Sequence, residues 1–152
     1  MSVSPETIID QIKKGPAGKD GEIQAGDSDL RLRIKLADWD RLGCLVERVE
    51  MKRSRPLSID PDRITQEVTY LGEALRVIER DEKDKRTILR SHIPLKEGDL
   101  ISFYEMILDS SEGLSLVRFA YDQKLGKRLS IPASLARETL ERFIINLVRL
   151  AS

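Results

Sequence analysis

Apolar residues recur at three- and four-residue spacing along the last part of the chain. They are Ala136, Leu140, Phe143, Ile144, Leu147, Val148 and Ala151. At about 100° per residue these positions fall on one stripe of a helix, and the charged residues between them point away from it. Because a helix with one apolar side needs a surface to pack on, the pattern predicts a long C-terminal helix across one face of a sheet.

The central part of the chain shows the alternation of apolar and charged residues that is typical of half-buried strands. Between Leu30 and Leu36, every second residue is leucine or isoleucine, and the residues between them are arginine or lysine. Further strand segments follow at residues 44–51, 75–80, 85–93, 100–108, 114–121 and 128–131. Since short polar turns join most of them, the pattern predicts a meander-rich antiparallel sheet of about five to seven strands.

Two shorter helices are predicted from start signals in which a capping side chain precedes a proline. The first opens at Ser4-Pro5, and the second covers residues 60–72 and opens at Asp60-Pro61. Their apolar sides consist of Ile8, Ile9 and Ile12 in the first helix and Ile64, Val68 and Leu71 in the second. The fold class is therefore α+β. This order of elements resembles the layout of small secretion-chaperone-type domains, a resemblance that no motif accompanies.

The chain divides into an N-terminal segment and one globular domain. Residues 14–29 hold four glycines and hardly any apolar residue, a composition that is typical of a flexible linker. We therefore expect residues 1–28 to form a short helix and a linker, and residues 29–152 to form a single α+β domain. A chain of 152 residues is about one domain long.

Charge and hydropathy exclude several classes of partner. Lysine and arginine number 26, as do aspartate and glutamate, so the net charge is zero. This balance disfavours a nucleic-acid backbone as the main partner and leaves no net repulsion between copies of the chain. No apolar run reaches the length of a membrane span, and the N-terminus lacks the apolar core of a signal peptide. With a single cysteine, Cys44, we expect a cytoplasmic protein that binds neither nucleic acid nor membrane.

Turn positions predict which residues of neighbouring strands face each other. If Ser111-Glu112 forms the tip of the hairpin between residues 100–108 and 114–121, Glu105 lies opposite Arg118. One face of this hairpin then becomes apolar, and we expect the C-terminal helix to pack on it. That face consists of Leu100, Tyr104, Met106, Leu108, Val117 and Phe119.

The opposite face carries one polar cluster. With the register kept through the preceding turn, Arg90 comes beside Glu105, and the row Arg90–Glu105–Arg118 spans three strands. His92 then lies close to Phe103. An exposed row of this kind is a cross-strand ion ladder, in which each pair contributes about 0.2–1 kcal/mol. The alternative is a site for an anionic group, because guanidinium groups form paired hydrogen bonds with carboxylate or phosphate. The candidate residues for contact with a ligand or partner are therefore Arg90, His92, Glu105 and Arg118.

Residues that would indicate catalysis or metal binding are scarce. His92 is the single histidine, so a two-histidine metal site cannot form, and one cysteine cannot build a cysteine-based site. The sequence contains no G-x-S-x-G motif, phosphate-binding loop or dinucleotide fingerprint. We expect no metal, no cofactor and no catalytic residue, and an enzyme is the least supported class.

Two other classes of function remain. The better supported is a non-enzymatic protein-binding or self-associating domain, adaptor- or chaperone-like, because the net charge is zero and residues 100–108 are apolar on both sides of the strand. The partner would be another protein or a second copy in a homodimer. The alternative is a small-ligand-binding domain with a pocket between helix and sheet, which would select an anion through Arg90 or Arg118.

Overall fold

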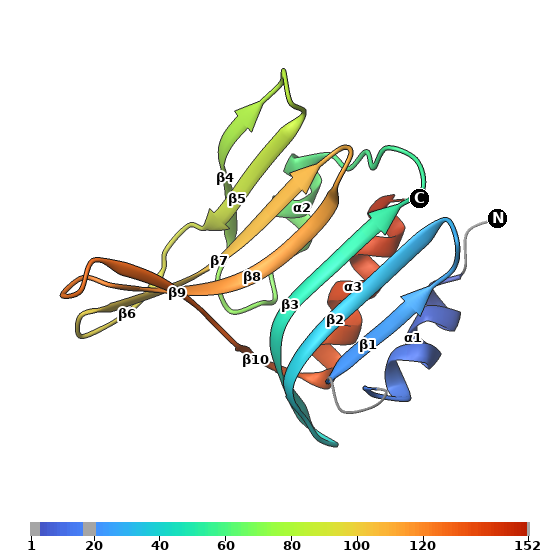
Figure 1. Ribbon diagram of the computed structural model, residues 1–152, viewed down its shortest axis with the longest axis horizontal. Helices are drawn as coiled ribbons and strands as arrows, with labels where there is room; N and C mark the ends of the chain where they lie inside the picture. The colour runs from blue at the N-terminus through green and yellow to red at the C-terminus, as the bar shows by residue number, and fades with distance from the viewer. Residues whose placement is uncertain (1–3, 17–20, 152) are drawn as a thin grey trace.

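The computed structural model describes residues 4–16 and 21–151 (Figure 1). Within these residues, three helices accompany a single antiparallel sheet of ten strands. In chain order the elements are α1 (Pro5–Lys13), β1 (Glu22–Gly26), β2 (Leu30–Trp39), β3 (Gly43–Arg53), α2 (Pro61–Glu67), β4 (Leu75–Asp81), β5 (Arg86–Ser91), β6 (Leu95–Glu97), β7 (Leu100–Asp109), β8 (Gly113–Asp122), β9 (Lys127–Ile131), β10 (Ala133–Ala136) and α3 (Arg137–Ala151). The predicted α+β class is confirmed, and the sheet has more strands than predicted.

The main path of the sheet is β1-β2-β3-β8-β7-β5-β4. Strands β3 and β8 pair only where Val49–Met51 meets Leu114–Leu116. Beyond this contact β9 pairs with β8, and β10, which follows β9 directly in the chain, pairs with β3. On the other side, β6 pairs with the first residues of β7. As a result, the strands around β6 and β9 project away from the rest of the sheet (Figure 1).

Alternation along the strands separates two faces of the sheet. On β7, Tyr104 and Met106 point to one face, and Glu105 and Ile107 point to the other. Because directly paired residues share a face, the face of Met106 also carries the buried residues Ile23, Ile34, Val49, Met51, Leu114 and Leu116. We call the face of Met106 the inner face and that of Glu105 the outer face.

Helix α3 lies behind β2 and β3 (Figure 1), rather than on the β7–β8 hairpin as predicted. Its buried residues are Leu140, Phe143, Ile144, Leu147, Val148, Leu150 and Ala151. This is the predicted apolar stripe with two changes, since Ala136 ends β10 and is exposed, and Leu150 is buried. The guanidinium group of Arg53 donates a hydrogen bond to the carbonyl of Ala151 and forms an ion pair with Asp29. The positive charge of Arg53 therefore lies at the negative end of the helix dipole.

The β7–β8 hairpin has a register one residue away from the predicted one. It closes through a three-residue loop, 110–112, so that Glu105 pairs with Val117 and Tyr104 pairs with Arg118. A shift of one residue moves each side chain to the opposite face. The predicted apolar face is therefore wrong for Val117 and Phe119, which lie on the outer face.

Gly113 is the reason for the three-residue loop. Its φ of 97° is a conformation that glycine adopts readily and other residues rarely do. A Cβ atom at this position would lie 2.2 Å from the carbonyl oxygen of Met51 on β3. The absence of a side chain therefore allows the start of β8 to approach β3 closely.

The N-terminal segment belongs to the same core as the sheet. The three isoleucines of α1 are buried, and α1 lies against β1 and α3. Residues 22–26, which their composition assigns to a linker, pair with β2 as β1. The linker prediction is wrong for these residues because the alternation of Ile23 and Ala25 with polar neighbours outweighs the flanking glycines. Residues 17–20 of the predicted linker lie outside the described residues.

Helix α2 is shorter than predicted. The side chain of Asp60 caps α2 as predicted by accepting a hydrogen bond from the backbone N–H of Asp62, and α2 ends at Glu67, before the predicted residue 72. The apolar residues predicted for this segment, Ile64, Val68 and Leu71, are nevertheless all buried. Among the described residues, no helix is long and apolar enough to cross a membrane.

Candidate functional site

The four predicted contact residues do not form one cluster. Arg90 of β5 and Glu105 of β7 are directly paired on the outer face, as predicted. Arg118 of β8 points to the inner face because of the register shift described above. His92 lies just beyond the end of β5 and is exposed, and its backbone N–H donates a hydrogen bond to the carbonyl of Ala74. The predicted row Arg90–Glu105–Arg118 is therefore wrong in its third member.

The third member of the row is Arg128 of β9. Glu105 Oε2 lies 2.6 Å from Arg90 Nε, and Glu105 Oε1 lies 2.9 Å from Arg128 Nη2. Glu105 is only 7% exposed. Burial raises the pKa of its carboxyl group, but the hydrogen bonds from Arg90 and Arg128 outweigh burial and hold the pKa below its usual value. The carboxylate is thus ionised and bonded on both oxygens, and it links β5, β7 and β9.

Two aromatic rings lie beneath the arginines. The guanidinium carbon of Arg128 is 3.6 Å from the centre of the Phe119 ring, and that of Arg90 is 5.7 Å from the centre of the Phe103 ring. The two rings are 6.0 Å apart. Contacts of this kind contribute about 0.5–1 kcal/mol at exposed sites. Each arginine therefore binds Glu105 and also shields an aromatic ring from water.

Arg118 belongs to a second polar cluster, on the inner face. Its two terminal nitrogens lie 2.7 and 3.2 Å from the carboxylate oxygens of Glu73, and both side chains are nearly buried. Ser91 Oγ donates a hydrogen bond of 2.6 Å to Glu73 and accepts one of 2.8 Å from the backbone N–H of Tyr104. The guanidinium carbon of Arg118 is also 4.5 Å from the centre of the Tyr104 ring. This cluster ties the loop before β4 to three strands.

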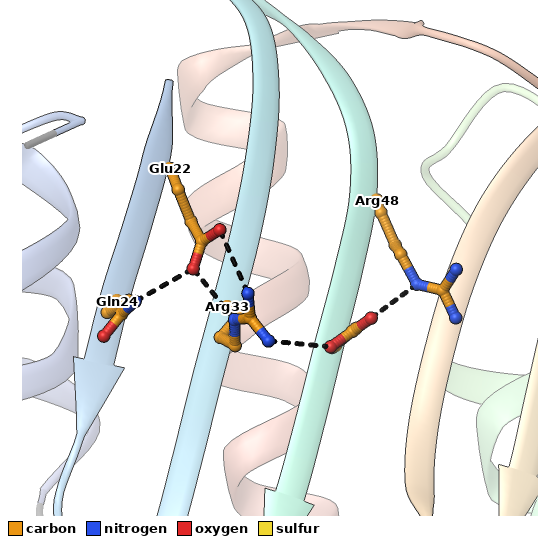
Figure 2. Close-up of polar contacts among 5 residues, drawn as sticks. Glu22, Gln24, Arg33 and Arg48 are labelled. Atoms are coloured by element: carbon orange, nitrogen blue, oxygen red, sulfur yellow. Dashed lines mark hydrogen bonds and ion pairs between the residues drawn. The ribbon is translucent and has the colours of Figure 1, made fainter. Parts of the chain in front are cut away.

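A row of charged side chains crosses the outer face of β1, β2 and β3 (Figure 2). Arg33 Nε lies 2.8 Å from Glu22, and Arg33 Nη1 lies 4.0 Å from Glu50. Glu50 also pairs with Arg48, 2.7 Å from its Nε. Hydrogen bonds from Arg33 and then Gln24 lower the pKa of Glu22. This is the solvated cross-strand ladder that the sequence suggested for the other row, and pairs of this kind add little to stability.

The described residues offer little for metal or thiol chemistry. No group of three histidine, cysteine, aspartate or glutamate residues within them could hold a metal ion. Cys44 is buried, and its thiol lies 3.6 Å from the carbonyl oxygen of Leu135. Burial raises the pKa of the Cys44 thiol to about 11, so the thiolate that reacts with electrophiles is scarce at neutral pH.

Residues 95–103 and 119–130 form a projecting unit that we call the arm. It contains β6, the start of β7, the end of β8, and β9 up to Ser130. Figure 1 shows it extending away from the three helices. Five of the eight large apolar side chains that are exposed among the described residues lie on the arm, and a sixth, Ile93, lies just before it. The five are Leu95, Leu100, Tyr121, Leu125 and Leu129.

Sequence reasoning missed Arg128 and Glu73 for different reasons. The sequence predicts a strand at residues 128–131 but does not predict which strand pairs with it, so the neighbours of Arg128 could not be named. Glu73 lies in a loop without periodicity. One signal was present for the correct register, because a glycine such as Gly113 at the end of a turn is typical of a three-residue hairpin loop. That loop places Glu105 and Arg118 on opposite faces.

Comparison with known proteins adds no relative. No protein-family model, no curated protein and no solved structure matches this chain.

Proposed function

We propose that this protein is a non-enzymatic, protein-binding domain and that the arm is its contact surface. The observation that carries the proposal is the concentration of exposed apolar side chains on the arm. Leu129, for example, is 64% exposed and Leu125 is 67% exposed. Apolar side chains that gather on one surface mark interaction sites more often than scattered ones do.

The physical reason is the cost of apolar surface in water. Each Å² of apolar area removed from water contributes about 25 cal/mol, so the burial of these leucines against a partner stabilises the complex. The other apolar side chains support this reasoning, because most of them are buried in the core. The buried residues form one core cluster in which α1, α3 and the inner face take part, and the arm leucines are not members of it.

The outer face beside the arm adds a second kind of contact group. Arg90 and Arg128, each more than a third exposed, lie over Phe103 and Phe119. Arginine and aromatic residues are enriched among the residues that contribute most to binding at protein interfaces. A cytoplasmic location is part of the proposal, and it is supported by the free, buried Cys44.

The anion-binding alternative has weaker support. Arg90, Arg118 and Arg128 each bind a carboxylate of the same chain, either Glu105 or Glu73. An anionic ligand would have to displace one of these carboxylates. A thermal-shift screen with anionic metabolites, run on the wild type and on Arg118→Ala, tests this alternative directly.

Site-specific photo-cross-linking tests the proposed surface. We would place benzoylphenylalanine at Leu129 on the arm and, as a matched control, at Leu42, which is 79% exposed and lies between β2 and β3. Irradiation is carried out in the cells that produce the protein naturally. We expect a cross-linked protein product of discrete mass from position 129 and none from position 42. No product from position 129, or the same products from both positions, would show that the arm is not a contact surface.

A further inference from the structure

We propose that the inner face of the arm binds the inner face of the arm of a second copy, in a two-fold symmetric dimer. This inference rests on the proposed function and names the partner. It is carried by the apolar side chains on this face, by their symmetric arrangement and by the charges at the two edges of the arm.

The inner face of the arm is an uncovered continuation of the face that forms the core. Leu100 lies two and four residues before Ser102 and Tyr104 on β7, so it points to the same face as Met106. Leu95 of β6 and Leu129 of β9 share this face through their pairing with Ser102 and Ala120. These three leucines are 45–64% exposed, whereas Met106 is fully buried. The helices lie on the inner side of the rest of the sheet, and within residues 4–16 and 21–151 none of them lies over the arm (Figure 1).

One cross-strand row of the arm has a symmetric profile. Across β6, β7, β8 and β9 it reads Leu95–Ser102–Ala120–Leu129. The two outer positions are leucines, and the two central ones carry small side chains. When a second arm is turned by 180° about an axis along the strands, its β9 lies over β6, and its β6 lies over β9. Each Leu95 then contacts the partner copy's Leu129, and the small central residues allow the two sheets to approach at the usual spacing of about 10 Å.

The next row supplies charges that fit the same rotation. It reads Glu97–Leu100–Asp122–Lys127. Glu97 and Lys127 lie exposed on the two edge strands, so the rotation brings Glu97 of each copy to Lys127 of the other. Asp122 does not disturb this match, because its carboxylate accepts hydrogen bonds from the backbone N–H groups of Lys124 and Leu125 in its own turn. Opposite charges therefore meet at both edges of the interface.

Glu97 and Lys127 cannot pair within one copy. They lie three strand spacings apart, which is about 14 Å at about 4.8 Å per spacing. A coupling between them would therefore report a contact between two copies. Zero net charge leaves no overall repulsion against such a contact. Three leucines per copy form a small interface, so we expect a weak dimer whose population depends on concentration.

Sedimentation equilibrium of the full chain, from micromolar to millimolar concentration, tests the inference. The wild type should show a reversible monomer–dimer equilibrium. Glu97→Lys and Lys127→Glu, each of which places two like-charged pairs in the dimer, should weaken association roughly tenfold. The double variant Glu97→Lys/Lys127→Glu should restore it. Lys124→Glu changes the net charge as much as Lys127→Glu does, but it lies in the turn of the same arm. It is the matched control and should associate like the wild type.

Two further variants check the apolar part of the contact. Leu129→Ser should weaken association at least about a hundredfold, because the symmetric interface loses a buried leucine from each of its two copies. Leu42→Ser, at an exposed leucine away from the arm, should leave association unchanged. Circular dichroism of each variant checks that the fold is intact.

The possible failures are distinguishable. A strictly monomeric wild type overturns the proposed dimer. So does a dimer whose association Leu129→Ser leaves unchanged, or one whose association the double variant Glu97→Lys/Lys127→Glu does not restore. The proposed function is judged separately by the cross-link from position 129. A product of twice the mass of the chain supports both proposals, and a product with a different protein supports the arm as a contact surface but overturns the second copy as its occupant.

Discussion

The Glu105 side chain is only 7% exposed, and its environment explains why a charged group is tolerated there. A carboxylate that leaves water loses hydration, and this loss is offset only when both oxygens find partners. Arg90 and Arg128 supply these partners from β5 and β9, on either side of β7. Because both arginines remain more than a third exposed, water screens part of the attraction. The carboxylate nevertheless connects three strands that are far apart in sequence.

Replacing Glu105 with glutamine removes the charge and keeps the size of the side chain. We expect Glu105→Gln to lower the free energy of unfolding at neutral pH by about 1–3 kcal/mol, because two guanidinium groups lose an ionised acceptor. Urea denaturation measures this difference. Glu82→Gln, at the exposed tip between β4 and β5, is the control and should change stability little.

The stability difference between the wild type and Glu105→Gln should depend on pH. The pKa of Glu105 is lowered in the folded protein, so its contribution to stability is present above the ordinary glutamate pKa of 4.5 and is lost as the pH falls through the folded-state pKa. The difference between wild type and Glu105→Gln should therefore shrink on acidification. A difference that stays constant down to the acid transition would contradict the ionised state of Glu105.

Alanine substitutions at two glycines distinguish the stability cost of a left-handed backbone conformation from the cost of a steric clash. Gly113 and Gly98 both have positive φ, but a Cβ atom would meet the carbonyl oxygen of Met51 at Gly113 and nothing within 4 Å at Gly98. We expect Gly98→Ala to cost about 1–2 kcal/mol for the left-handed conformation alone, and Gly113→Ala to cost clearly more. Thermal or urea unfolding of both variants measures the difference. Equal costs would mean that β8 and β3 do not meet as closely as described.

At the scale of elements, the strands with clear alternation were predictable and the irregular ones were not. The predicted segments at residues 100–108 and 114–121 match β7 and β8 to within one residue at each end. Strand β6 has three residues and β10 has four, which is too short for a periodic pattern to stand out. Pairing partners decide whether such segments become strands, and β10 forms because it lies beside the part of β3 that β8 leaves free.

The attachment of β9 gives a prediction at this scale. Arg128→Lys keeps the positive charge but loses the planar group that stacks on Phe119 and bonds to Glu105. We expect faster amide hydrogen exchange at residues 127–131, where β9 pairs only with β8 among the described strands. Lys124→Ala, in the turn just before β9, is the control. Unchanged exchange in Arg128→Lys would show that backbone pairing alone holds β9.

At the scale of the whole molecule, the described chain has one hydrophobic core. Residues of α1, β1 and α3 lie in the same buried cluster as those of β7 and β8. Figure 1 shows α1 at the far end of the molecule from the arm, so the core is shared along one side of a long, single sheet. We therefore expect the N-terminal helix to unfold together with the sheet.

A core substitution in α1 tests this unity. Ile12 is fully buried, and we expect Ile12→Ala to lower the free energy of unfolding by about 2–4 kcal/mol. The loss should appear equally in the fluorescence of Trp39, the single tryptophan, and in far-ultraviolet circular dichroism. Leu42→Ala, at an exposed leucine, should change little. A loss seen for neither probe would mean that α1 is only loosely attached.

The sequence by itself determined the class of fold, the long strands, the apolar side of α3 and the pairing of Arg90 with Glu105, because each depends on local periodicity or on a nearby turn. The tertiary structure alone decided the contact of Glu105 with Arg128, the contact of Arg118 with Glu73, the place of residues 22–26 in the sheet, and the uncovered inner face of the arm. The physical reason is that side-chain alternation has a period of two, so a single extra residue in the loop before Gly113 exchanges the faces of a whole strand. Which surface remains uncovered depends on where helices far away in the sequence come to lie, and no local pattern records that.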